Sequence, residues 1–200
     1  MTPRIEITYS GIYDIVLLKS KKIKYNHKRL VEGERFAKKL QKVWDKYSEQ
    51  ILSHMSKVTG LKWQKNYIEC FVTFNAPYPF FHPLTIYVGN RTEPAIMTIV
   101  HELSHTLLWG NKNKVKWPES NIGIYRTYQR ENYNTKLHFS VHAIVTLVIN
   151  KVFGRNSEKY LRWERWWRRE PNHPMANEYK RSWEIVREEG PEKVIKELIK

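Results

Sequence analysis

The segment from Thr92 to Gly110 constrains the chain more than any other, because it places two histidines four residues apart in an apolar run. Thr92 can cap a helix at one end, and Gly110 stands where such a helix would stop. Residues i and i+4 lie on one face of a helix, so the imidazoles of His101 and His105 can bind one metal ion. Glu102 then projects beside that ion, where it can accept a proton from water. The motif HELSH therefore predicts a metal-dependent catalytic helix.

A catalytic zinc needs a third protein ligand and leaves a fourth position for water. The apolar helix predicted at 137–153 carries His138 and His142, again four residues apart and on the same flank of its core-facing stripe. The spacing does not decide between them. We slightly favour His142 as the third ligand because it lies deeper in the apolar run. His138 would then support one of the metal ligands by hydrogen bonding. Glu119 and Glu131 are weaker candidates, since a loop positions a ligand less rigidly.

The remaining patterns predict an α+β chain, with a few-stranded sheet packed on a long helix and on the HELSH helix. The first 20 residues favour one or two strands, and residues 30–58 favour one long amphipathic helix. Further strands are predicted at 67–74 and 84–88, a loop at 111–135, and helices at 157–169, 177–189 and 191–200. Residues 1–155 would form the main domain, and 156–200 a basic, Trp-rich helical extension of the same globule.

Composition limits the class of protein and its chemistry. The formal net charge is +15, and 18 of the 20 acidic residues are Glu. One cysteine, Cys70, excludes a disulfide framework within the chain. No signal-peptide segment and no apolar run of membrane-spanning length is evident, so we expect a cytoplasmic protein without a membrane span.

The five residues from His101 to His105 resemble the active-site helix of the zincin metallopeptidases. The resemblance implies a Zn²⁺ cofactor, a peptide or protein substrate, and Glu102 as the general base. Gluzincins take a Glu from a downstream helix as third ligand, whereas residues 136–154 contain no acid here. The metzincin extension is also missing, because TLLWGN follows His105.

Peptide hydrolysis by such a site would need further groups around the metal. Tyr125, Tyr128 and Tyr133, in the predicted loop, are candidate donors to the oxyanion. Since Asp is nearly absent, we expect backbone carbonyls to orient His101 and His105.

The segment KYLRWERWWRRE at 159–170 interleaves aromatic and basic residues, as nucleic-acid-binding proteins often do. Tyr160, Trp163, Trp166 and Trp167 share one helical face, which favours packing against the rest of the protein. The charge still favours acidic partners or nonspecific binding of nucleic acid. The alternative function is therefore a nucleic-acid-associated protein. It would be either a protease acting on DNA-bound proteins, similar to SprT-type zincins, or a binding module without catalysis.

Overall fold

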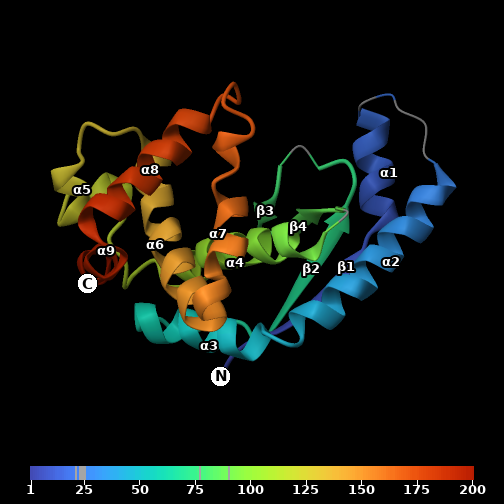
Figure 1. Ribbon diagram of the computed structural model, residues 1–200, viewed down its shortest axis with the longest axis horizontal. Coiled ribbons are helices and arrows are strands. Elements are labelled where there is room, and N and C mark those ends of the chain that lie inside the picture. The colour runs from blue at the N-terminus through green and yellow to red at the C-terminus, as the bar shows by residue number, and fades with distance from the viewer. Residues whose placement is uncertain (21, 23–25, 77, 90) are drawn as a thin grey trace.

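A computed structural model describes residues 1–20, 22, 26–76, 78–89 and 91–200, without the side chains of Ser20 and Trp167. It contains a four-stranded sheet in the order β1-β2-β4-β3. The strands are β1 (Arg4–Tyr9), β2 (Tyr67–Thr73), β3 (Phe80–Phe81) and β4 (Leu84–Tyr87). β1, β2 and β4 are parallel, and β3 pairs antiparallel with β4 at the edge. With helices forming most of the rest of the fold, the predicted α+β class is confirmed (Figure 1).

Of the one or two strands predicted in the first 20 residues, one is present, β1, and a helix follows it. Residues Gly11–Ser20 form helix α1, in which Asp14 is fully buried. The Asp14 carboxylate accepts hydrogen bonds from the backbone N–H groups of Phe74 and Asn75, directly after β2. Ile12 and Val16 are exposed on this helix, so the run of apolar residues does not form a buried strand.

The single helix predicted at 30–58 is two helices, α2 (His27–Trp44) and α3 (Ser48–Thr59). The chain turns at Asp45, and the N–H of Tyr47 donates to the carbonyl of Trp44. Apolar spacing continues across the turn because both helices bury residues in the same core. Periodicity alone therefore could not locate the break.

The two helices that carry the candidate metal-ligating histidines are α4 (Thr92–Gly110) and α6 (Tyr133–Phe153). α4 contacts β3 and β4 on one side and α6 on another. α6 begins before the predicted residue 137, because the Asn132 side chain caps it by accepting from the N–H of Thr135 at 2.8 Å. The predicted loop before it contains a short 3-10 turn, η1 (Pro118–Ser120), and a helical turn, α5 (Ile124–Thr127).

The C-terminal segment packs around α6. It comprises η2 (Gly154–Asn156), α7 (Ser157–Glu164), η3 (Trp166–Arg168), α8 (Ala176–Glu189) and α9 (Pro191–Leu198). α7 contacts α4 and α6, while α8 and α9 contact α6 (Figure 1). The ring of Tyr160 stacks on Phe153 with centroids 3.8 Å apart, and Trp166 packs on Tyr179 at 5.1 Å. The side chain of Trp167 lies outside the described residues.

One stretch, Tyr133–Glu164, is long and apolar enough to cross a membrane by length and composition alone. Within its most apolar window, 56% of the residues are buried inside the fold. α6, which forms most of this stretch, is surrounded by α3, α4, α8 and α9. The central helix of a water-soluble core meets the same criterion, so this finding is weak evidence for a membrane span.

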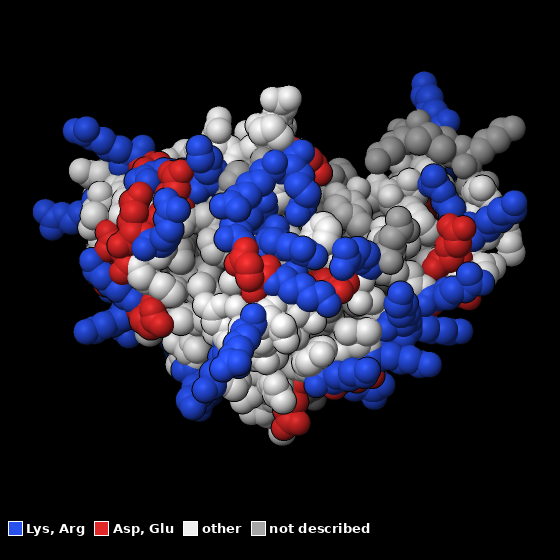
Figure 2. Space-filling view, viewed as in Figure 1, with Lys and Arg blue, Asp and Glu red and all other residues white. Residues whose placement is uncertain are grey.

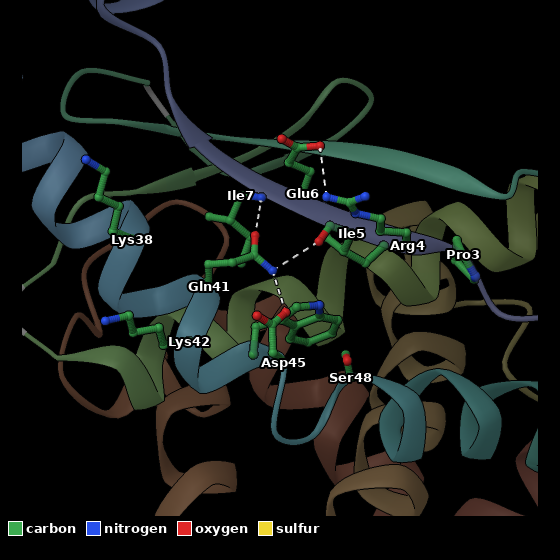
Figure 3. Close-up of a pocket in the computed structure, with 11 residues that line it drawn as sticks. Pro3, Arg4, Ile5, Glu6, Ile7, Lys38, Gln41, Lys42, Asp45 and Ser48 are labelled. Atoms are coloured by element: carbon green, nitrogen blue, oxygen red, sulfur yellow. Dashed lines mark hydrogen bonds and ion pairs between the residues drawn. The ribbon is translucent and has the colours of Figure 1, made fainter.

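The free edge of the sheet at β1 is covered by a side chain. Gln41 of α2 accepts a hydrogen bond from the N–H of Ile7 at 2.6 Å and donates to the carbonyl of Ile5 at 3.2 Å (Figure 3). A residue of a further parallel strand would make the same two bonds. A pocket of about 560 Å³ lies beside this edge, and none of its lining residues belongs to α4 or α6. We therefore interpret Gln41 as protection of the edge.

Replacing Gln41 by Ala should lower the free energy of unfolding by about 1 kcal/mol, because two backbone groups lose their protein partner. Urea denaturation measures the change. The control is Lys42→Ala, an exposed position on the same helix, with an expected effect within about 0.5 kcal/mol. Equal stability of the two variants would contradict the role assigned to Gln41.

Candidate metal centre

Helix α4 turns the HELSH residues towards the interior. His101 and Glu102 are 6% and 8% exposed, and His105 is half-buried. The Nε2 atoms of His101 and His105 lie 3.3 Å apart. Two ligands of a tetrahedral zinc with bonds of about 2.0–2.1 Å are separated by about 3.3–3.4 Å. The two imidazoles are thus placed as one metal ion would require.

Helix α6 brings both of its candidate histidines to the same place. His138 is 6% exposed, and His142 is fully buried. The ring of His101 lies 5.5 Å from that of His138 and 5.8 Å from that of His142, measured between centroids. The Nδ1 of His138 donates to the carbonyl of Asn134 at 2.8 Å, one turn earlier in α6. This bond makes the Nε2 of His138 the ring nitrogen that carries a lone pair, as a metal ligand requires.

Two overlapping groups of side chains could hold a metal ion. The first is His101, His105 and His138, and the second is His101, His142 and Glu164. Within each group the ligand atoms lie within 4.8 Å of one another. The structure therefore places His138, and not His142, in a group with both histidines of HELSH. Glu119 is exposed and Glu131 pairs with Arg181 at 2.8 Å, so neither loop acid joins these groups.

Glu164 of α7 is a site residue that the sequence reasoning missed. Its buried carboxylate contacts the Nδ1 of His101 in a short hydrogen bond and lies 3.5 Å from the Nε2 of His142. A carboxylate thus orients His101, where a backbone carbonyl was expected. The signal was available in the helical spacing, because Tyr160 and Leu161 are buried and Glu164 follows them by four and three residues.

Two residues of α8, Tyr179 and Ser182, also reach the cluster. The Tyr179 hydroxyl lies 2.8 Å from the Nε2 of His138 and is its donor, because the Nδ1 of that ring already donates to Asn134. The Ser182 hydroxyl donates to the carbonyl of Tyr179 at 2.7 Å. The same hydroxyl lies 2.9 Å from the Nδ1 of His142. The buried Nε2 of His142 has no hydrogen-bond partner among the described residues, and it faces the Glu164 carboxylate at 3.5 Å.

The three tyrosines predicted as oxyanion donors have other partners. The Tyr125 hydroxyl bonds to Ser140 at 2.9 Å, and that of Tyr128 donates to Glu189 at 2.7 Å. Tyr133 is 48% exposed and interacts with Glu119. All three precede or begin α6, whereas the hydroxyl beside the histidines belongs to Tyr179, on a helix that follows it.

Burial and neighbouring charges set the protonation of the site. Burial and the surrounding histidines hold the pKa values of His105 and His138 well below the usual range. Both rings are therefore neutral near pH 7, as metal ligation requires. Burial alone would lower the pKa of His101, but the Glu164 carboxylate raises it to about 9, so this ring would release a proton when a metal binds. Burial lowers the pKa of His142 to about 4.

The two carboxylates of the site are shifted in opposite directions. Burial raises the pKa of Glu102 to about 7. Burial alone would also raise the pKa of Glu164, but the contact with His101 outweighs it and holds that pKa well below its usual range. Glu102 is thus able to exchange a proton near neutral pH, while Glu164 stays ionised.

Known proteins add no assignment to this geometry. Neither a protein-family model, nor a curated protein, nor a solved structure matches the chain. Only the side chains gathered on α4, α6, α7 and α8 can therefore indicate a function.

Proposed function

We propose that this chain is a zinc-dependent metallopeptidase of the zincin type. The observation that carries the proposal is the pairing of the His101 and His105 Nε2 atoms, 3.3 Å apart, with the buried Glu102 between them in sequence. The site is buried and rich in imidazole, which suits zinc better than it suits Mg²⁺ or Ca²⁺.

We favour His138 as the third ligand because it lies in one group with His101 and His105. The sequence had slightly favoured His142, which lies deeper in the apolar run of the same helix. The ring of His138 is neutral, and Asn134 fixes the tautomer that exposes Nε2. Glu164 then accepts from the opposite nitrogen of His101, the arrangement that orients metal-ligating histidines in many proteins. When bound, Zn²⁺ would supply a Lewis acid and lower the pKa of water to about 7.

Glu102 acts as the general base of the proposed reaction. With a pKa of about 7, its carboxylate takes a proton from the attacking water and returns it to the leaving amine. Tyr179 takes the role of oxyanion donor, because a metal at the Nε2 of His138 would replace the hydrogen bond that the Tyr179 hydroxyl donates there. Burial, with Glu102 and Glu164 nearby, raises the pKa of Tyr179 well above its usual range, so its hydroxyl keeps its proton. A protonated hydroxyl can donate a hydrogen bond to charge that develops on a carbonyl oxygen.

The purified protein should contain one zinc per chain, measured by elemental analysis after dialysis. His101→Ala, His105→Ala and His138→Ala should each lose it, because three ligands are needed to hold the ion. His142→Ala is the matched control on the same helix and should retain one zinc per chain. Loss of zinc from His142→Ala but not from His138→Ala would exchange the roles of the two rings. A wild-type protein that takes up no zinc at neutral pH would refute the proposal.

Glu102→Gln should lower kcat for peptide hydrolysis by about 10²–10⁴-fold while zinc content and folding stay unchanged. The amide keeps the shape of the side chain but cannot accept the proton. Cleavage of an unstructured protein such as casein, followed by mass spectrometry of the products, gives both the rate and the scissile bonds. Undiminished cleavage by this variant would exclude Glu102 as the base.

Tyr179→Phe should lower kcat by about 10²-fold or more and leave KM nearly unchanged, because the hydroxyl acts on charge that develops in the transition state. The matched comparison is Tyr125→Phe, whose hydroxyl bonds to Ser140 and should not affect turnover. A similar loss in both variants, or a change confined to KM, would assign Tyr179 a structural or binding role instead.

A further inference from the structure

Helix α7 and the η3 turn after it have two chemically different faces. The inward face carries Glu164, which contacts His101 in the candidate metal centre. Figure 2 shows basic side chains gathered over the middle of the molecule. The exposed basic residues of this segment and its flanks are Arg155, Lys159, Arg162, Arg168 and Arg169, while Arg165 is partly buried. The same short segment thus forms one wall of the site and a strongly basic surface beside it.

Trp163 holds several of these cations close together. The guanidinium of Arg169 lies 4.5 Å from the centre of the indole ring, and that of Arg162 lies 5.4 Å away. Arg91, from the turn before α4, reaches the same ring at 5.5 Å. Three like charges around one ring repel one another, so the arrangement favours an anion that would contact more than one of them.

The neighbouring acids neutralise only one end of this surface. Glu93 pairs with Lys159 at 3.1 Å and with Arg91 at 3.4 Å. Glu158 pairs with Arg165. Among the described residues, no acidic side chain pairs with the exposed residues Arg162, Arg168 and Arg169, which we call the arginine surface. The guanidiniums of Arg162 and Arg168 are available to an external anion. That of Arg169 donates to the carbonyls of Arg162 and Trp163 at 3.3 and 3.4 Å, and its remaining N–H groups can still contact an anion.

Among the described side chains of the segment, the aromatic rings do not offer a stacking platform. Tyr160 packs on Phe153 and Trp166 on Tyr179, which points both rings into the fold. None of the described side chains at 155–170 is a large apolar group exposed to solvent. A surface that binds a membrane usually exposes large apolar side chains, whereas binding to a nucleic-acid backbone needs only cations.

We propose that the arginine surface binds the phosphate backbone of nucleic acid, without reading its sequence. Guanidinium groups contact phosphate oxygens in a bidentate way, and successive phosphates match a row of cations. Bound there, the nucleic acid lies beside the wall of the candidate metal centre. This binding goes beyond the proposed hydrolysis and does not depend on the metal.

Fluorescence anisotropy with a labelled oligonucleotide of about 20 nucleotides, single- or double-stranded, tests the proposal across about 50–200 mM salt. The triple variant Arg162→Ala/Arg168→Ala/Arg169→Ala should bind about 10-fold or more weakly. Its slope of log K against log salt should fall by about 2, because three phosphate contacts are removed. The matched control is Lys39→Ala/Lys42→Ala/Lys46→Ala, which removes the same charge from exposed positions of α2 and its C-terminal turn and should change binding by at most about 2-fold.

Equal losses in the two triple variants would overturn the proposal, because net charge alone would then explain binding. Tighter binding to phosphatidylserine vesicles than to the oligonucleotide would overturn it in favour of a membrane. Circular dichroism checks the fold, and Arg168→Ala alone, at an exposed position, should still weaken binding if the triple variant unfolds. His105→Ala, which removes a predicted zinc ligand but leaves the contact between Glu164 and His101, should bind nucleic acid like the wild type, which separates this proposal from the metallopeptidase proposal.

Discussion

The buried contact between Glu164 and His101 links the fold to the candidate site. A carboxylate removed from water is stable only when it is paired and hydrogen-bonded, and the imidazole of His101 provides both. The contact joins α7 to α4, and the 3.5 Å approach to His142 adds α6. The packing of α4, α6 and α7 against one another thus keeps the buried charge of Glu164 paired. The same packing orients the ring of His101.

This dependence makes the last 45 residues part of the centre, because Glu164, Tyr179 and Ser182 all belong to them. Each contacts a different histidine: Glu164 contacts His101, Tyr179 contacts His138, and Ser182 contacts His142. α4 and α6 alone would leave three of the four imidazoles without these partners. We infer that the segment after Gly154 orients the histidines of α4 and α6, in addition to covering them.

Local periodicity predicted the parts of the site that lie within one helix, and it could not predict those that depend on contacts between helices. The sequence correctly predicted that His101 and His105 share one face of their helix, and that His138 and His142 share one face of theirs, because residues four apart lie on the same side of a helix. Which ring of α6 meets His105 depends on how that helix is rotated against α4. The N-terminal apolar run was interpreted as strand because its one buried acid, Asp14, finds its partners sixty residues later. Distant partners of this kind leave no trace in a short window of sequence.

The composition of the chain acquires a meaning once the two carboxylates of the site are compared. Glu102 and Glu164 are the same residue type, both are buried, and both are near His101, yet their pKa values move in opposite directions. Burial dominates at Glu102, while Glu164 has direct contact with the ring. Two acids with separated pKa values can divide the work of moving a proton and holding a charge. A chain with only two Asp can therefore supply both functions from Glu alone, because the environment of each carboxylate, rather than its residue type, sets its role.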